Sequence, residues 1–85
     1  MKKTEFVKAV AKRNGISNRQ AYRAVNSVLD TMRVLLSEGE EIEIGGFGTF
    51  EVLTDLRGNS IPVFRSGKPL KRVLNAPVET GEQED

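Results

Sequence analysis

The sequence has neither cysteine nor histidine among its 85 residues. Disulfides, metal sites with cysteine or histidine ligands, and catalytic triads or dyads that use these residues are therefore excluded. No apolar run approaches the roughly 20 residues that a membrane span needs, and no signal-peptide core follows the first residues. The remaining polar residues form no catalytic constellation. We expect a soluble, cytoplasmic protein that is not an enzyme and has no metal, no cofactor and no small-molecule substrate.

The chain is also too small to build a large hydrophobic core. At 9.4 kDa it can form only one small domain, and a domain of this size buries only about 60–65% of the surface that its unfolded chain exposes. Small chains compensate with disulfides, metals or oligomerisation. Because disulfides and cysteine or histidine metal sites are excluded, oligomerisation is the expected compensation.

The net charge of only +1 hides an uneven distribution of charge. Residues 76–85 carry four acidic residues and no basic one, which leaves all 13 basic residues and eight acidic residues in residues 1–75, a net charge of +5. A basic body with an acidic end is typical of a protein with an anionic partner, although the charges could also serve solubility alone. We predict a folded domain over residues 1–75 and a disordered acidic tail over residues 76–85.

The first half of the sequence predicts two helices. Apolar residues from Phe6 to Ala11 share one face of a helix over residues 3–14, which Asn14-Gly15 ends. Ser17 and Gln20 have the spacing of a capping box, which opens a second helix over residues 18–38.

The second helix carries more apolar surface than the first helix can cover. A helix of about 21 residues spans about 30 Å, and its apolar residues are spaced 4-3-4-3 along that length. A second chain could cover the remainder, and packing on a sheet of the same chain is the alternative. We predict an obligate dimer whose core or interface residues are Val25, Val28, Leu29, Met32, Phe47, Phe50 and Phe64.

After Gly39 the apolar pattern changes to a period of two, which is typical of strands. Strands are predicted over residues 41–44, 49–53 and 61–65, and a short basic helix over residues 68–75. The predicted order is α-α-β-β-β-α, an α+β fold. Gly46 and Gly48 allow a tight reversal between the first two strands, and they could also let backbone amides approach a phosphate group.

The order of elements and several strings resemble the HU and integration host factor family of bacterial DNA-bending proteins. The resemblance covers roughly residues 1–75. It rests on Lys3-Thr4-Glu5, Asn14-Gly15-Ile16-Ser17, Gly39-Glu40, Ile42-Glu43-Ile44, Gly46-Phe47-Gly48-Thr49-Phe50-Glu51-Val52 and Phe64-Arg65-Ser66-Gly67-Lys68-Pro69-Leu70-Lys71.

The resemblance implies an intertwined homodimer, or a heterodimer with a relative, in which each chain projects a β-ribbon arm. Such proteins are architectural binders of double-stranded DNA, so a histone-like, nucleoid-associated function is expected. It also implies phosphate contacts at Lys3 and Lys68. Lys68, Lys71 and Arg72 have i, i+3 and i+4 spacing, so they share one side of the short helix. A solvated basic face is the alternative. The predicted DNA-binding residues are Lys3, Gly46, Gly48, Arg57, Arg65, Lys68, Lys71 and Arg72.

The arm is shorter than the family pattern. Only 13 residues separate Phe50 from Phe64, about half of what a full arm requires, and Ser60 stands where the family has a proline that wedges between base pairs. We therefore predict weak bending and little preference for kinked or nicked DNA, with Leu53 and Leu56 packed in the hairpin.

The sequence as a whole predicts a dimeric DNA-binding protein without sequence preference, which binds phosphates mainly through its body. The alternative is a protein-interaction module of the same fold, which pairs with a full-length relative and modulates it.

Overall fold

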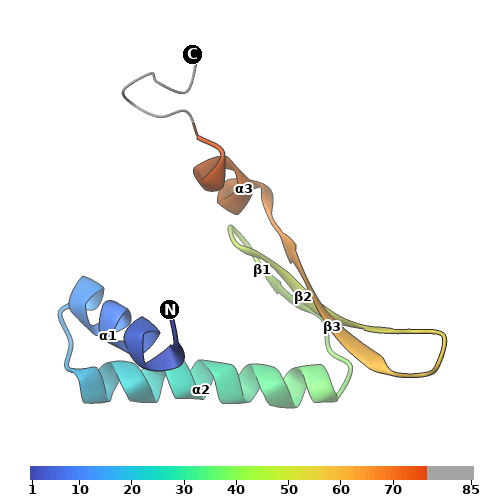
Figure 1. Ribbon diagram of the computed structural model, residues 1–85, viewed down its shortest axis with the longest axis horizontal. Coiled ribbons are helices and arrows are strands. Elements are labelled where there is room, and N and C mark those ends of the chain that lie inside the picture. Colours follow the sequence, from blue (N-terminus) through green and yellow to red (C-terminus); the bar gives the residue numbers. More distant parts are fainter. Residues whose placement is uncertain (77–85) are drawn as a thin grey trace. The chain divides into compact units, whose positions relative to one another are not determined.

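The computed structural model describes residues 1–76, and all of the predicted acidic tail except Ala76 lies outside these residues. The described chain has the predicted order α-α-β-β-β-α (Figure 1). Each element begins and ends within one residue of its predicted bounds. The elements are α1 (Lys3–Asn14), α2 (Asn18–Ser37), β1 (Ile42–Ile44), β2 (Gly48–Thr54), β3 (Ser60–Ser66) and α3 (Lys68–Leu74).

The N-terminal unit, residues 1–34, contains α1 and most of α2. Gly15 ends α1 in the left-handed conformation with φ of 64°. The predicted capping box is present, because the Ser17 amide donates to Gln20 Oε1 at 3.0 Å and the Gln20 amide donates to Ser17 Oγ at 3.0 Å. These reciprocal bonds satisfy amides that the first turn of α2 would leave unpaired.

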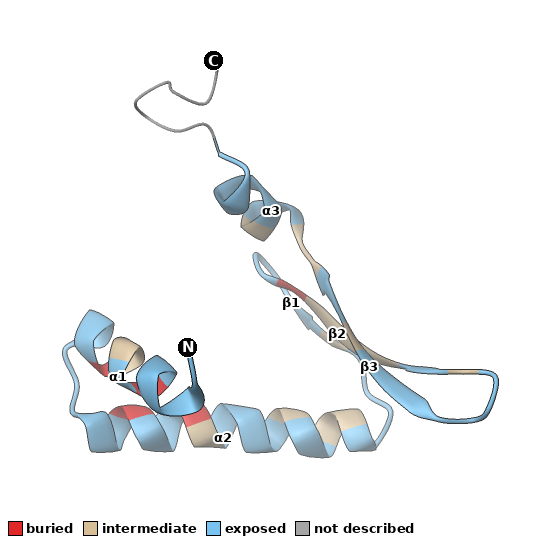
Figure 2. Ribbon diagram, viewed as in Figure 1, coloured by how far each residue is buried: buried red, intermediate tan, exposed pale blue. Residues whose placement is uncertain are grey.

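The core of the N-terminal unit is small. Its buried hydrophobic residues are Val7, Ala11, Ala21 and Val25, and they lie where α1 and α2 face each other (Figure 2). Next to them is a shallow apolar groove of about 310 Å³ whose lining residues include Val28 and Leu29. Val28 is 57% exposed, so a single chain leaves much of the predicted α2 stripe uncovered.

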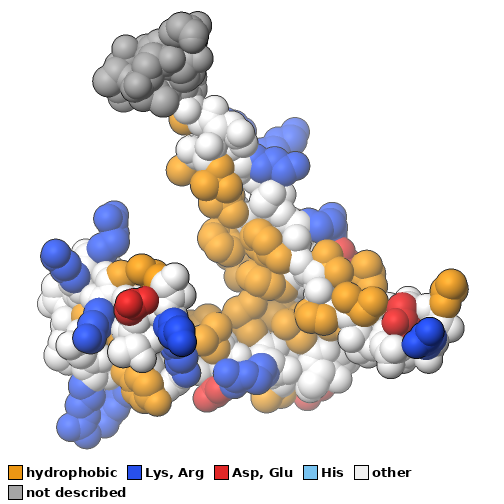
Figure 3. Space-filling view, viewed as in Figure 1, with side chains coloured by type: hydrophobic (Ala, Val, Ile, Leu, Met, Phe, Trp, Pro, Cys, Tyr) orange, Lys and Arg blue, Asp and Glu red, His pale blue; other side chains and the backbone are white. Residues whose placement is uncertain are grey.

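The second unit begins at Leu35 and contains an antiparallel sheet in the order β1-β2-β3. Phe50 pairs with Phe64 across β2 and β3, and their ring centroids lie 4.7 Å apart. Phe47 joins them, with its centroid 5.4 Å from that of Phe64. Phe47 and Phe64 are nevertheless 46% and 41% exposed, and hydrophobic side chains gather along the sheet (Figure 3).

Gly48 is a packing requirement of the sheet. It is buried at the start of β2, and a Cβ placed on it would lie 2.5 Å from the Arg65 carbonyl oxygen and 2.6 Å from carbons of the Phe64 ring. No side chain can occupy that space without moving backbone. Gly46, in the turn before it, adopts φ of 87°, which only glycine adopts without strain.

The loop between β2 and β3, residues 55–59, is held by one carboxylate. Asp55 Oδ1 accepts hydrogen bonds from the amides of Arg57 and Asn59, each at 2.8 Å. The bond from the Asn59 amide is the largest of the effects that lower the pKa of Asp55, although partial desolvation opposes it. The carboxylate therefore keeps these bonds at neutral pH and loses them only as the pH falls through its lowered pKa.

The structure corrects one expectation for this hairpin. Leu53 lies opposite Ile61 in the ladder and is half-exposed. Leu56, in contrast, has a relative exposure of 106%, so the prediction that it packs in the hairpin is wrong. The Asp55 carboxylate turns into the loop to accept backbone amides, and the loop has no apolar interior against which Leu56 could pack.

No helix in residues 1–76 is long and apolar enough to cross a membrane.

Candidate nucleic-acid interface

The short helix α3 carries the largest group of predicted binding residues. The Gly67 amide donates to the Phe47 carbonyl at 2.8 Å, which ties the start of α3 to the glycine-rich turn before β2. Pro69 occupies the first turn, where its missing N–H costs nothing. Lys68, Lys71 and Arg72 are all exposed. The start of α3 is therefore fixed to the sheet, and the helix exposes three cations to solvent.

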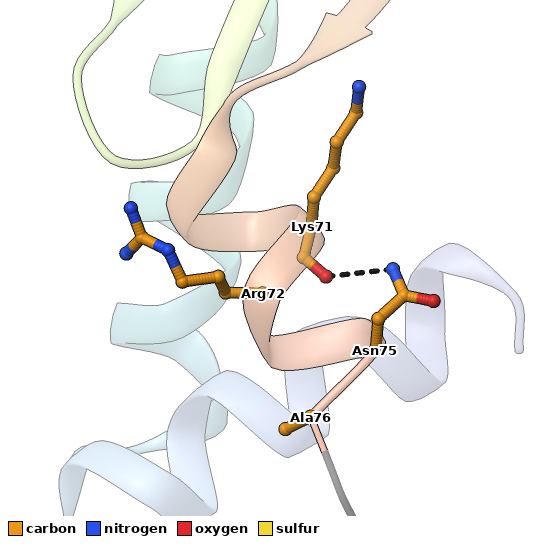
Figure 4. Close-up of a pocket in the computed structure, with 4 residues that line it drawn as sticks. All are labelled: Lys71, Arg72, Asn75 and Ala76. Atoms are coloured by element: carbon orange, nitrogen blue, oxygen red, sulfur yellow. Dashed lines mark hydrogen bonds between the residues drawn. The ribbon is translucent and has the colours of Figure 1, made fainter.

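The cations of α3 form a broad surface and do not converge on one pocket. The side chains of Lys71 and Arg72 extend to different sides of the helix (Figure 4). The Asn75 side-chain amide donates to the Lys71 carbonyl at 2.9 Å and caps the last turn. An open hollow of about 480 Å³ is lined by Lys71, Arg72, Asn75 and Ala76. Such a surface suits an extended polyanion better than a single small anion.

These cations have no counter-charge among residues 1–76. Within residues 1–76, no carboxylate forms an ion pair with Lys68, Lys71 or Arg72. The tip residue Arg57 is likewise exposed and unpaired in that part of the chain. Unpaired, solvated cations can exchange their counterions for phosphates without first breaking a bond within the protein.

Arg65 differs from the other predicted cations because it is already paired. Its Nε lies 2.7 Å from Glu51 Oε2 and its Nη2 lies 3.9 Å from Glu41 Oε2. A phosphate contact at Arg65 would have to compete with both carboxylates. The sequence interpretation missed this pairing, although the register contains the signal. Once Phe50 pairs with Phe64, Glu51 and Arg65 become diagonal neighbours on the opposite face of the ladder.

The N-terminal unit contributes Lys3. Its Nζ lies 5.6 Å from the centroid of the Tyr22 ring, within the range of a cation–π interaction. Both residues are exposed, so the lysine is oriented by the ring while its charge stays accessible to solvent.

The two glycines of the predicted interface differ in accessibility. Gly46 is exposed in its turn, and Gly48 is buried beneath the Phe64 ring. Packing alone accounts for a glycine at position 48. A contact between phosphate and a backbone amide stays a prediction for both, and the exposed position of Gly46 suits it better.

The fold and this surface define a small α+β protein in which a helical unit and a β-hairpin unit both carry solvated cations. A family model described as bacterial DNA-binding protein matches residues 1–57. DNA-binding protein HU of Geobacillus stearothermophilus is 33% identical over 86 aligned residues, which cover 84% of this chain and 96% of that protein. The prophage-derived DNA-binding protein HU 2 of Bacillus subtilis is 33% identical over 91 residues, which cover 89% and 99%.

Solved structures agree with these relatives. HU from Thermotoga maritima superposes with a TM-score of 0.76 at 33% identity, over 88% of this chain and all of that one. An Anabaena HU–DNA cocrystal structure gives 0.75 at 25% identity, over 91% and 100%. The chain belongs to the HU family of bacterial DNA-binding proteins. This membership confirms the resemblance, the α+β fold and the prediction that the protein is not an enzyme.

Proposed function

We propose that the protein binds double-stranded DNA without sequence preference, as a histone-like architectural protein of the cytoplasmic nucleoid. The observation that carries the proposal is the group of exposed cations on α3, which have no carboxylate partner within residues 1–76, in a chain of the HU family. Contacts from lysine and arginine to phosphates give affinity without sequence information. Lys3 and Arg57 would add phosphate contacts, and Arg65 would do so only after leaving its carboxylate partners.

The binding unit in this proposal is a dimer. The α2 groove and the half-exposed phenylalanine rings of the sheet are apolar surfaces that one chain leaves open to water. A second copy of the chain would bury them, and a heterodimer with a related chain would use the same surfaces. Val28, Leu29 and Met32 are the residues of α2 that we assign to this interface.

The short hairpin limits how far DNA can be wrapped. Only four cross-strand pairs of β2 and β3 lie between the Phe50–Phe64 pair and the loop. Each strand therefore extends roughly 13 Å beyond that pair, at about 3.3 Å per residue. Bending a 20–30 bp site by 40–90° costs about 1–6 kcal/mol, which must be offset by added contacts. The proposal therefore includes modest overall bending and a short footprint.

Binding to unrelated duplexes tests the proposal. Gel-shift titrations at low salt on three 30 bp duplexes of different sequence should give dissociation constants that agree within about threefold, because phosphate contacts carry no sequence information. Large differences among the duplexes would contradict sequence-independent binding. Absence of binding to all three would instead favour the alternative, a protein-interaction module that pairs with a full-length relative.

Replacing Glu51 should strengthen DNA binding. Glu51→Gln removes the closer partner of Arg65 and frees its guanidinium for phosphate. An exposed ion pair is worth up to about 1 kcal/mol, so we expect a two- to fivefold gain in affinity, roughly, by fluorescence anisotropy. Glu43→Gln is the matched control, since it removes the same charge from the sheet without touching an Arg65 partner. Equal gains in the two variants would show that the loss of one negative charge, and not the release of Arg65, strengthens binding.

A further inference from the structure

A strongly acidic segment follows the basic helix α3 along the chain. Residues 77–85 begin two residues after Asn75 and carry four acidic residues and no basic one, a charge of −4. The acidic residues are Glu79, Glu82, Glu84 and Asp85. The segment lies outside the described residues. Its charge is opposite in sign to that of the three cations of α3 and similar in size, so the two are complementary neighbours in the sequence.

The helix α3 has a charge that nothing else in the described chain neutralises. Lys68, Lys71 and Arg72 are exposed, and within residues 1–76 they form no ion pair with a carboxylate. The sheet carboxylates Glu41 and Glu51 pair with Arg65 instead. A counter-charge for α3 within this chain would therefore have to come from the segment that follows it.

A hollow beside α3 adjoins the point where this segment begins. The hollow, of about 480 Å³, is lined by Lys71, Arg72, Asn75 and Ala76 (Figure 4). Ala76 is the last described residue, so residue 77 continues directly from the wall of the hollow. Lys71 and Arg72 extend to different sides of the helix (Figure 4). A single carboxylate could not serve both, whereas an extended segment with several carboxylates could.

The acidic segment is long enough to reach every cation of α3. Residues 77–85 can span up to about 30 Å at about 3.3 Å per residue. The seven residues of α3 are only about 10 Å long, at about 1.5 Å per residue. The segment can therefore return along the whole helix as far as Lys68. Because it is joined to α3 through two residues, its effective concentration there is in the millimolar range, so even a weak contact is occupied.

We propose that residues 77–85 bind to α3 of their own chain, with their carboxylates on Lys68, Lys71 and Arg72, and compete with DNA phosphates for these cations. The inference rests on the proposed DNA-binding function and assigns a regulation to the same interface. DNA has to displace the segment before its phosphates reach α3. The segment therefore lowers the affinity of α3 for DNA.

A distance measurement without DNA tests the contact. The chain has no cysteine, so Gln83→Cys supplies a single thiol for a nitroxide label and keeps all four acidic residues. At about 50 mM salt, where charges are weakly screened, the label should broaden the amide NMR signals of α3. The control protein has the same label and lacks the four charges, through Glu79→Gln, Glu82→Gln, Glu84→Gln and Asp85→Asn. It should broaden these signals much less, and equal broadening in the two proteins would overturn the inference.

Mixed samples test whether the segment binds its own chain. Nitroxide-labelled chains are mixed with isotope-labelled chains that carry no nitroxide, so that only contacts between chains broaden the observed signals. The amide signals of α3 should stay sharp, because the segment is joined directly to its own α3. Broadening in this sample would place the segment on a second chain and contradict the inference.

DNA affinity tests the competition. Neutralising all four acidic residues should raise the affinity for a 30 bp duplex about tenfold at about 50 mM salt, since an exposed ion pair changes an equilibrium constant by up to about fivefold and at least two such pairs are released. In a chain that also carries Lys71→Ala and Arg72→Ala, the same neutralisation should gain less than about twofold. An equal gain in both backgrounds would show that the acidic residues only repel DNA, and the inference would be wrong.

Two acidic residues outside the segment provide a matched control. Glu38 and Glu40 are exposed and form no ion pair within residues 1–76, and they have the same spacing as Glu82 and Glu84. Replacing Glu82 and Glu84 by Gln should raise DNA affinity about threefold, because roughly half of the segment's charge is lost. Replacing Glu38 and Glu40 by Gln should change it less than about 1.5-fold. Equal changes would contradict a specific contact with α3.

The outcomes separate this inference from the proposed function. If DNA binds, and neutralising the segment changes neither the broadening of the α3 signals nor the affinity, the inference is wrong and the proposed function stands. If the segment broadens the α3 signals and none of the proteins binds DNA, the proposed function is wrong, the competition fails with it, and the contact stands. If the broadening and DNA binding are both absent, both are wrong.

Discussion

Raising the salt concentration from 50 to 200 mM should weaken the binding of duplex DNA by roughly three decades, if each dimer neutralises about six phosphates. The expectation follows from the cations of α3, which have no carboxylate partner within residues 1–76 and would exchange their counterions for phosphates on binding. Anisotropy titrations of a labelled 30 bp duplex at four or five salt concentrations measure the slope. An interaction that is insensitive to salt would contradict the phosphate-based interface.

Lys68→Ala tests whether α3 is the source of the salt dependence. In the proposed dimer the substitution would remove one phosphate contact per chain and two in all. The slope of log affinity against log salt should therefore become shallower by about two, and affinity at 100 mM salt should fall roughly 50-fold on every sequence alike. Lys12→Ala is the matched control, because Lys12 is also an exposed helical lysine and lies outside the predicted interface. An equal loss in both variants would show that net charge alone, and not α3, governs binding.

Sedimentation equilibrium at micromolar concentration should give about twice the chain mass of 9.4 kDa. The physical reason is the shortage of core, since the buried hydrophobic residues of the described chain are only Val7, Ala11, Ala21 and Val25. Because a core of this size offsets little of the conformational entropy of folding, we expect most of the stabilising burial to come from a second chain. A well-folded species that stays at the mass of one chain would overturn the dimer proposal.

Val28→Asp should abolish this assembly. The substitution places a carboxylate in the apolar groove of α2, where a partner chain would have to desolvate it. Because folding and assembly are linked, the melting temperature of the wild-type protein should rise with its concentration, and the variant should be largely unfolded at micromolar concentration by circular dichroism. Ser27→Asp, on the exposed side of the same helix, is the control and should remain folded and dimeric.

Most of the fold could be predicted from the sequence because its signals are local. The i, i+4 spacing in α1, the capping box at Ser17 and the alternation after Gly39 each depend on neighbouring residues, and each corresponds to an observed element. The register of β2 and β3 is not a local property. It decides that Gly48 meets the Phe64 ring and that Glu51 meets Arg65, and neither contact could be read from composition or spacing.

The sequence predicted which residue types form the candidate interface. It predicted less well which of these residues are free of partners within the protein. Lys68, Lys71 and Arg72 are exposed. Their spacing predicted that they share one side of α3, whereas the side chains of Lys71 and Arg72 extend to different sides of the helix (Figure 4). Arg65 is a cation of the same type, and only the fold reveals its carboxylate partners. Leu56 is the reverse case, because a residue that was predicted to pack is fully exposed. A leucine is assigned to packing by default, and the hydrogen bonds of Asp55, which leave the loop without an apolar interior, are a property of the folded loop.

The close approach at Gly48 also constrains how the hairpin could lengthen or shorten. With Phe64 fixed over Gly48 and paired with Phe50, the base of the ladder cannot slip, so residues can be gained or lost only beyond it and in equal numbers on both strands. Successive cross-strand pairs point to opposite faces of a sheet. Deleting one pair would turn the tip to the opposite face, whereas deleting two would restore its direction. Hairpins of this base that present the same tip should therefore differ in length by four residues at a time, so that the length of the hairpin varies in discrete steps while its anchor stays the same.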